Sequence, residues 1–297
     1  MDIVKVKKTV VKAMSKIVTP AYAVGYRYNA EDTAFSLHKE LAYSVIMPTA
    51  SLWYADPFPF ICEQKHYIFA ELMKSKQKKG TIGVVCLEDG DELFREILSE
   101  PFHLSFPNVF SYGGHVYMIP ESSEVRQIRL YKAEQFPYRW KLEQVLVERI
   151  AAVDTAVWAE DGKLLLETHD LETKQNRFFV CDMESLSTKE FASKENRFVN
   201  RRPGGSFAQY RSGVYHALQN CDGAYGKWLH MAKVERFTED GLAEQELCTV
   251  KLRDISRKKT PKGQGEKAIF DRIHTFNRTD DFEVIDFRVW RLEFLNR

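Results

Sequence analysis

Apolar and polar residues alternate in short runs along much of the chain, which is the period expected of half-buried β-strands. Many of these runs come in pairs that are joined by turn-forming residues, such as Tyr112-Gly113-Gly114 and Glu160-Asp161-Gly162. Such residues accept the positive φ that tight hairpins require, so each pair predicts a β-hairpin. No long pattern of helical period interrupts the pairs.

The hairpins recur in five copies. Their segments are WYADPF (53–58) with KHYIFAE (65–71), FPNVF (106–110) with HVYMIPE (115–121), VDTAVW (153–158) with KLLLE (163–167), RPGGSF (202–207) with GVYHA (213–217), and IHTFN (273–277) with FEVID (282–286). The centres of the second segments lie 50, 48, 50 and 69 residues apart. A period near 50 residues that is made of strand hairpins is typical of propeller blades.

The chain is therefore expected to be all-β, a five-bladed β-propeller with a short N-terminal helical or irregular preface. Residues 46–297 form the propeller in this interpretation, and residues 1–45 form the preface with a strand that can close the ring. The long last step contains the charged stretch 253–267, which predicts a surface loop or lid. No linker divides the chain into two domains.

Composition narrows the class of protein. The chain has 297 residues, with 43 basic and 42 acidic side chains, and this balance argues against a nucleic-acid-binding protein. The five cysteines are an odd number without CxxC spacing, so neither a zinc site nor a disulfide framework is indicated. Reduced thiols and a cytoplasmic location are expected.

The first eighteen residues, MDIVKVKKTVVKAMSKIV, have lysines scattered among apolar residues. They lack the uninterrupted apolar core of a signal peptide, and no stretch of the chain approaches the roughly 18 apolar residues of a membrane span. Two interpretations stay open, an ordinary surface helix and an amphipathic basic helix that rests on an anionic membrane. The second would make the protein a peripheral membrane contact.

Radial blades place the start of each innermost strand around a central channel, so the first segments should line its mouth. One polar residue from each gives Asp56, Asn108, Asp154, Arg202 and His274. The second segments of the first three copies add acids near strand ends, namely Glu71, Glu121 and Glu167. A buried carboxylate without a partner is costly, so acids at equivalent blade positions suggest a shared polar site. The alternative is that they cap turns or pair with arginines.

Three of these acids are the catalytic candidates, namely Asp56, Glu121 and Asp154. Carboxylates around one pocket can divide the roles of base, acid and neighbour that tunes a pKa. Candidates for substrate binding are Trp53, Glu71, Lys74, Asn108, Arg126, Arg202, Gln219, Tyr225 and His274.

Several of these binding candidates have two interpretations. Trp53 beside Asp56 offers a face for sugar stacking or is simply core. Arg202 grips a phosphate or carboxylate, or pairs with an acid of the chain. The loop that contains Gln219 and Tyr225 binds hydroxyls or is a plain turn.

Lys74 and Arg126 receive phosphate if they lie near the channel, and are otherwise solvated. His274 is an acid–base group or a structural histidine. The chain lacks a Walker loop, a dinucleotide GxGxxG, a GxSxG elbow and an HExxH zinc motif, and no metal ligands are assigned.

The ordered motifs resemble a known family. They look like the propeller domain at the N-terminus of plant glucosamine inositolphosphorylceramide transferases and in stand-alone bacterial relatives. That domain is similar to the five-bladed furanosidase-type glycoside hydrolases, which include arabinanases and β-xylosidases. The residues that carry the likeness lie between about 45 and 290, and they are WYADPF, FPNVF, YMIPES, VD, RPGG, the loop 219–226 and IHTFN.

The resemblance implies roles for the acids. In the hydrolases a first-blade aspartate is the general base, a later aspartate tunes a pKa, and a glutamate is the general acid. Asp56 and Asp154 match the first two roles, and Glu121 is the candidate acid. The hydrolase acid usually follows the tuning aspartate in chain order, however, whereas Glu121 precedes Asp154, which argues against hydrolysis.

Some of the bacterial relatives resemble transferases that move a phosphoribofuranosyl group from phosphoribosyl pyrophosphate. The implied function is therefore transfer of a furanosyl group from an activated phosphosugar to a precursor of a cell-surface polysaccharide, with Mg²⁺ as an assisting ion for a pyrophosphate donor. Hydrolysis of furanosyl linkages and non-catalytic glycan binding are the alternatives.

Overall fold

The computed structural model of the protein describes residues 18–28, 42–74, 77, 79–90, 93–193, 201–210, 213–221, 226–255, 257–258 and 269–292. The N-terminal helix expected within residues 1–17, the site candidate Tyr225 and most of the charged stretch 253–267 lie outside the described residues. Regular structure in the described part consists of β-strands and three short 3-10 segments, η1 (Leu87–Asp89), η2 (Ser123–Val125) and η3 (Leu252–Asp254).

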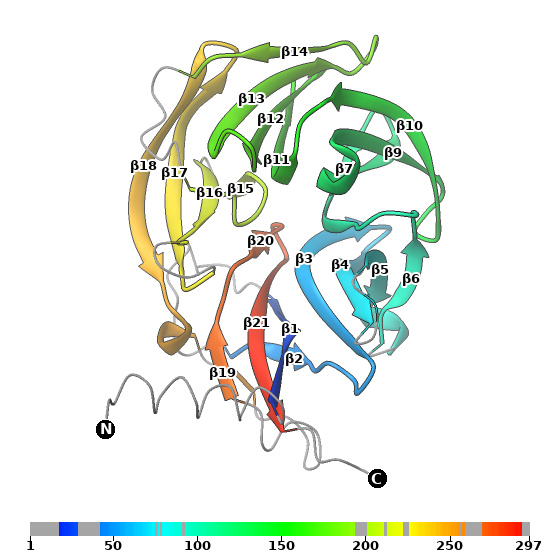
Figure 1. Cartoon of the computed structure of the whole chain (residues 1–297), viewed down its shortest axis with the longest axis vertical. Helices are drawn as coiled ribbons and strands as arrows, with labels where there is room; N and C mark the ends of the chain where they lie inside the picture. The colour runs from blue at the N-terminus through cyan, green and yellow to red at the C-terminus, as the bar shows by residue number, and fades with distance from the viewer. Residues whose placement is uncertain are drawn as a thin grey trace.

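Five sheets of antiparallel strands stand around a common axis, which confirms the predicted five-bladed propeller (Figure 1). The first blade is β3 (Leu52–Cys62), β4 (Lys65–Lys74), β5 (Gly80–Cys86) and β6 (Arg95–Leu98). The second is β7 (Ser105–Tyr112), β8 (His115–Glu121), β9 (Gln127–Gln135) and β10 (Arg139–Glu148). The third is β11 (Ala152–Glu160), β12 (Lys163–Asp170), β13 (Gln175–Asp182) and β14 (Thr188–Phe191). The fourth is β15 (Ala208–Tyr210), β16 (Gly213–Gln219), β17 (Leu229–Thr238) and β18 (Gly241–Val250).

The fifth blade combines strands from both ends of the described chain. It consists of β19 (Ile269–Arg272), β20 (Phe276–Arg278), β21 (Phe282–Leu292), β1 (Val18–Tyr28) and β2 (Ser44–Ile46). β1 pairs with β21 over eleven residues, from Val18 opposite Leu292 to Tyr28 opposite Phe282. Because eleven residue pairs of the ladder join the two ends, the ring of blades is closed by main-chain hydrogen bonds.

The predicted hairpins form the two innermost strands in the first three blades, whereas in the fourth the predicted first segment, residues 202–207, precedes the strand β15. The turns at Gly113–Gly114 and Asp161–Gly162 have positive φ at both residues, as the turn prediction requires. Strands inside a blade are buried on both faces because each blade packs between two others: six consecutive residues of the innermost strand β3 and all seven of β5 are buried. The outermost strand β10 instead has mostly exposed side chains.

Five apolar clusters hold the ring together, one at each junction between neighbouring blades. The junction of the first and second blades, for example, packs Phe58 and Phe69 against Phe106 and Met118, all at most 2% exposed. Burying one side chain of this size stabilises a fold by about 1.5–3 kcal/mol. The core therefore lies between the blades, and the axis is left for polar residues.

Hydrogen bonds cross the axis below the mouth and form what we call the polar floor (Asn108, Ser206 and Asn277). The Asn108 amide donates to Ser206 Oγ at 2.8 Å and to the carbonyl of Thr155 at 3.2 Å. The main-chain N–H of Ser206 donates to Asn277 Oδ1 at 2.7 Å, and the Asn277 amide donates to the carbonyl of Pro57 at 2.9 Å. The floor thus ties together main chain or side chains of all five blades.

Candidate active site

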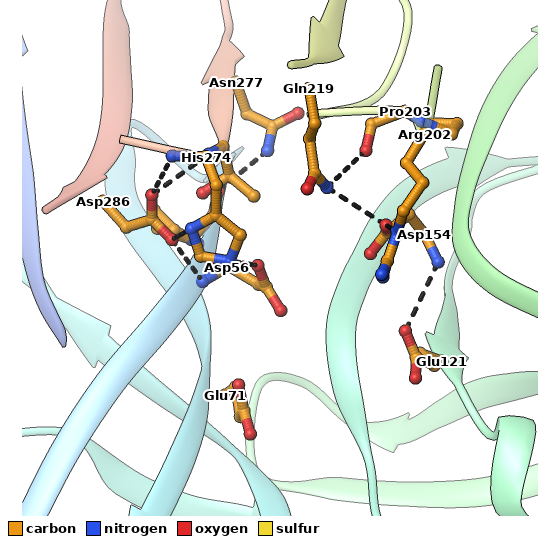
Figure 2. A network of polar contacts seen from close by, with 12 residues as sticks. Asp56, Glu71, Glu121, Asp154, Arg202, Pro203, Gln219, His274, Asn277 and Asp286 are labelled. Carbon is orange, nitrogen blue, oxygen red and sulfur yellow. Dashed lines mark hydrogen bonds and ion pairs between the residues drawn. The ribbon is translucent and has the colours of Figure 1, made fainter. Parts of the chain in front are cut away.

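β-Bulges interrupt the innermost strands of the first three blades at equivalent positions. In each bulge one residue has a positive φ, namely 49° at Asp56, 47° at Phe106 and 52° at Asp154. The pairing register shifts there, between Ala55 and Phe58, between Ser105 and Asn108, and between Val153 and Ala156. Bulges often re-aim a side chain near functional sites. Here they place Asp56 and Asp154 in the space between their two blades (Figure 2).

The bulges correct the equivalences drawn from the sequence. Phe106 occupies the position of Asp56 and Asp154, whereas Asn108 lies two residues further along and belongs to the polar floor. All three bulges have the same register, and the proline that follows each of the first two bulge residues, Pro57 and Pro107, was the available signal for the correct alignment. On the second strands Glu71 lies opposite Ala55 and Glu121 opposite Ser105.

The third blade departs from the expected pattern of acids on its second strand. The residue that corresponds to Glu71 and Glu121 is His169, which lies opposite Val153. Glu167 lies two residues earlier, opposite Ala156, and its side chain is fully buried beside His216. Glu167 is therefore not part of the mouth.

The mouth triad (Asp56, His274 and Asp286) forms the first half of the site. His274 Nε2 lies 3.1 Å from Asp56 Oδ1, and His274 Nδ1 lies 2.6 Å from Asp286 Oδ2. Asp286 Oδ1 also accepts the main-chain N–H groups of His274 and Thr275 at 3.0 Å each. One imidazole therefore connects two carboxylates that come from different blades.

Burial and charge act on this triad in opposite directions. Burial alone would lower the pKa of His274, but the charge of Asp286, the nearby Tyr22 and hydrogen bonds to both carboxylates hold that pKa well above its ordinary value. Burial raises the pKa of Asp56 despite its hydrogen bond to His274. Burial also opposes ionisation of Asp286, yet His274 and two main-chain N–H donors lower its pKa overall. A positive imidazolium with Asp286 as its counter-ion is favoured.

The triad is also the one cluster among the described residues whose His and carboxylate atoms lie close enough to hold a metal ion. Both ring nitrogens of His274 already face a carboxylate, and the raised pKa favours the protonated ring, which has no lone pair to give. Mg²⁺ moreover prefers oxygen ligands and keeps several waters. The residues fit an internal ion-pair network better than a metal centre.

Asp154 organises the second half of the site. Its Oδ2 accepts Arg202 Nε at 2.5 Å and Gln219 Nε2 at 3.0 Å, and its main-chain N–H donates to Glu121 Oε2 at 3.4 Å (Figure 2). The Gln219 amide also donates to the carbonyl of Pro203 at 2.8 Å, so its orientation is defined. Arg202 thus pairs with an acid of the chain, one of the two interpretations of the sequence.

Two further acids lie near both halves. Burial, then the charge of Asp154, raises the pKa of Glu121 to about 8, against the lowering effect of Arg202. Burial, then the charges of Asp56 and Glu121, holds the pKa of Glu71 well above its ordinary value. Several buried carboxylates that raise one another's pKa cannot all ionise at neutral pH, so the site contains carboxyl groups that carry protons.

The structure also places the remaining candidates. Trp53 is half-buried, and its ring lies 5.5 Å from Tyr22, which in turn lies 4.9 Å from His274. The Lys74 ammonium pairs with Glu96 on the outermost strand of its blade at 3.3 Å. Arg126 pairs with Glu172. Each of the two cations pairs with an exposed acid, and neither joins the cluster of buried acids.

Sequence reasoning missed Asp286 and His103. Asp286 ends the second segment of the fifth copy as Glu71 and Glu121 end theirs, and that shared position was the available signal. His103 lies before β7, outside the repeated segments, and its Nε2 is 3.5 Å from Glu71 Oε1. No pattern in the sequence marks it.

Comparison with known proteins agrees with this picture. The model of the family "Glucosamine inositolphosphorylceramide transferase 1, N-terminal" matches residues 41–277, about four fifths of the chain. The chain belongs to this family. A curated relative, glucosamine inositolphosphorylceramide transferase 1 of Arabidopsis thaliana, is 32% identical over 206 residues, or 65% of this chain. The protein of the same name from Oryza sativa subsp. indica is 28% identical over 204 residues, or 64% of this chain.

The chain matches 27% of the length of each of these two plant relatives, so it spans about a quarter of them. Among the described residues, no helix has the length and apolar character needed to cross a membrane.

Solved structures of other propellers share the fold. A family 117 glycoside hydrolase from Zobellia galactanivorans aligns with a TM-score of 0.51 and 11% identity over 90% of both chains. The family 62 α-L-arabinofuranosidase domain of Coprinopsis cinerea aligns with a TM-score of 0.53 and 10% identity, over 82% of this chain and 94% of that one. At such low identity the likeness concerns the fold alone.

Proposed function

We propose that the protein is a glycosyl-transferring enzyme that moves a furanosyl group from an activated phosphosugar to a precursor of a cell-surface polysaccharide. The donor that we favour carries a phosphoribofuranosyl group on pyrophosphate. Membership of a family whose curated relatives are named as transferases supports the transfer. The fold shared with α-L-arabinofuranosidases is compatible with a furanose ring in the mouth.

The observation that carries the proposal is the pair of side chains on Asp154. A furanosidase of the related type is expected to have its acid after the tuning aspartate in chain order. The later residues that bind the Asp154 carboxylate are Arg202 and Gln219. A guanidinium stays charged and an amide has no acidic proton, so neither replaces that acid. A guanidinium beside the reacting centre instead suits an anionic donor.

In this mechanism Asp56 is the general base. Its carboxylate takes the proton of the acceptor hydroxyl, the acceptor oxygen bonds to the anomeric carbon, and the bond from that carbon to the pyrophosphate oxygen breaks with its electron pair. His274 orients Asp56 through the 3.1 Å contact. Arg202 stabilises negative charge near Asp154, and Mg²⁺ bound to the donor pyrophosphate would spread the leaving charge. A cytoplasmic site of action, with contact to the membrane surface, is part of the same proposal.

One observation favours a second function, hydrolysis of furanosyl linkages. Glu121 has a pKa of about 8, so it carries a proton at neutral pH as a general acid must. It also contacts the main chain of Asp154, the residue that would tune it. The order of the acids along the chain argues against this function.

A donor screen tests both functions. Purified protein is incubated with phosphoribosyl pyrophosphate or nucleotide sugars, with Mg²⁺ or with a chelator, in the presence of glycan acceptors, and mass shifts of the acceptor are measured. We expect the acceptor to gain the mass of one phosphopentosyl group. The rate of this reaction should fall about 10²–10⁴-fold in Asp56→Asn, the usual contribution of a general base. Asp89→Asn, in an exposed ion pair of the same blade, is the matched control.

Each other outcome of the screen has a definite meaning. Release of free pentose from an arabinoside, also lost in Asp56→Asn, would establish the hydrolase instead. Glycan binding without turnover, unchanged in Asp56→Asn, would show a non-catalytic module.

A further inference from the structure

Glu71 occupies a separate place in the mouth. It lies on β4, opposite Ala55 of β3 and Ile82 of β5, and its side chain is 8% exposed. Figure 2 shows its carboxylate apart from both the mouth triad and the Asp154 group, below Asp56 in this view, with no dashed contact to either. A buried acid that neither ion-pair network uses has a different role from the other four.

The surroundings of Glu71 hold it in one place. A Cβ atom at Gly80 would lie 2.8 Å from Glu71 Oε1, 2.9 Å from His103 Cε1 and 2.5 Å from the carbonyl oxygen of Leu104. These contacts are too short for any other residue, so glycine provides the space for the carboxylate and the imidazole together. His103 Nε2 lies 3.5 Å from Glu71 Oε1, at the long end for a hydrogen bond.

The tautomer of His103 follows from its second nitrogen. The main-chain N–H of Gly80 donates to His103 Nδ1 at 2.9 Å. A main-chain N–H is always a donor, so Nδ1 must accept, and the hydrogen of the neutral ring is on Nε2. That hydrogen points at Glu71. His103 is half-buried and its main-chain N–H donates to Glu124 at 2.8 Å, which fixes the residue at the rim.

Electrostatics agrees with this geometry. Burial lowers the pKa of His103, against the charges of Asp56 and Glu124, so the ring is neutral at pH 7. The pKa of Glu71 is raised by burial and by its acidic neighbours. The pair is therefore a carboxylic acid beside a neutral imidazole, and the imidazole donor is placed to stabilise the carboxylate that forms when the proton leaves.

We propose that Glu71 is a catalytic residue of this site that gives its proton to the leaving oxygen, and that His103 is its positioning residue. In the step the O–H bond of Glu71 breaks and the proton goes to the oxygen that departs from the anomeric carbon. The Glu71 carboxylate that remains accepts the hydrogen of His103 Nε2. The inference rests on the proposed function, because it needs a group transfer with an oxygen leaving group.

The first test needs no substrate. The infrared band of protonated carboxyl groups is measured at pH 7 for the wild type and for Glu71→Gln, an isosteric variant whose folding is checked by its thermal transition. We expect the difference spectrum to contain one protonated carboxyl, which titrates away only at alkaline pH. The control is Glu63→Gln, in an exposed turn of the same blade. A spectrum without that band overturns the inference whatever the enzyme catalyses.

The second test uses turnover of phosphoribosyl pyrophosphate. Glu71→Gln should lower kcat at least tenfold with little change in KM, and the alkaline limb of the pH profile should vanish. The solvent deuterium isotope effect on kcat should fall in Glu71→Gln, because no proton then moves from residue 71 to the leaving oxygen. An isotope effect that Glu71→Gln leaves unchanged would overturn the role of Glu71 as proton donor. A wild type that turns over no donor would overturn the proposed function, an outcome that the infrared band does not depend on.

His103 is tested through the titration of Glu71. Replacing its donor in His103→Phe should shift the alkaline titration of the Glu71 band to higher pH, because the carboxylate loses a hydrogen bond. His103→Gln, which keeps an N–H donor, should restore most of the wild-type titration. An unchanged titration in His103→Phe would show that His103 only fills space.

Discussion

Two carboxylate–histidine–carboxylate groups are buried in the described part of this propeller, and only one of them lies at the mouth. The second, the interblade triad, lies between the third and fourth blades and consists of Glu167, His216 and Glu244. In it a single nitrogen, His216 Nδ1, faces both acids, at 2.8 Å from Glu244 and 3.6 Å from Glu167. In the mouth triad each nitrogen of His274 faces a different acid.

The difference arises from the strands that carry the two groups. Glu167 and His216 lie in stretches of regular pairing with the next strand of their blade, and Phe207 covers the His216 ring at 4.2 Å. Asp56 lies in a bulge with positive φ, and Asp286 binds main-chain N–H groups. The side chains of the interblade triad are thus at most 2% exposed, whereas those of Asp56 and His274 in the mouth triad keep 8% and 5% of their surface exposed. Local strand geometry sets this difference.

The largest effect is expected from removing the two histidines in turn. His216→Leu leaves two buried carboxylates without their cation, so we expect a loss of about 3–5 kcal/mol in the free energy of unfolding, measured by urea denaturation. His274→Leu should cost less, since Asp286 keeps its main-chain donors, but it should abolish turnover. The opposite ranking of the two stabilities would contradict the comparison.

The pH dependence of His216→Gln sharpens the same point. The charge of Glu244, and then that of Glu167, raises the pKa of His216 above 6.5 although burial alone would lower it. The ion pair therefore contributes its full stability below pH 6.5, and the contribution is lost as pH rises through the raised pKa of the folded state. The difference in unfolding free energy between wild type and His216→Gln should shrink in that direction. A pH-independent difference would mean that the ring is neutral.

Glu121 should behave in a different way because it is an acid with a raised pKa. Its pKa changes from 4.5 to about 8 on folding, chiefly through burial, so the folded state binds the extra proton between these values. Stability from this group is therefore lost as pH rises from about 4.5 to 8. Glu121→Gln should flatten the pH dependence of Tm and be more stable than the wild type at pH 9. Equal Tm values at pH 9 would show that Glu121 ionises normally.

The smallest effect is expected at Lys74. Its ammonium is half-exposed and pairs with Glu96 on the outer strand, so Lys74→Ala should change turnover less than twofold and stability by no more than about 1 kcal/mol. A large increase in KM for a phosphorylated donor would instead place this cation in the binding site, as the sequence suggested.

The sequence predicts some features of this structure and not others. The blades were predictable because hairpin turns and alternation are local properties, and Asp56 and Asp154 were found because they recur at one place in the repeat. Their bulges were not predicted, since a positive φ at Asp56 or Asp154 leaves no mark in the sequence. Asn108 was aligned in place of Phe106 although a proline follows both Asp56 and Phe106.

Contacts between distant segments could not be predicted from the sequence either. The pairing of Lys74 with Glu96 depends on which strand lies at the outer edge, and that of Glu167 with His216 depends on how two blades pack. His103 acquires its role only because Gly80 leaves room for the Glu71 carboxylate and the His103 ring where a Cβ atom would stand. Registers and packing of this kind are properties of the assembled ring.

The polar floor closes the central channel to molecules that would pass from one face of the ring to the other. Because Asn108, Ser206 and Asn277 bridge the blades across the axis, a polymer cannot thread through the ring from one face to the other. In the proposed transfer, donor and acceptor would therefore enter, and product would leave, through the same opening. A glycan acceptor would present only its tip to Asp56.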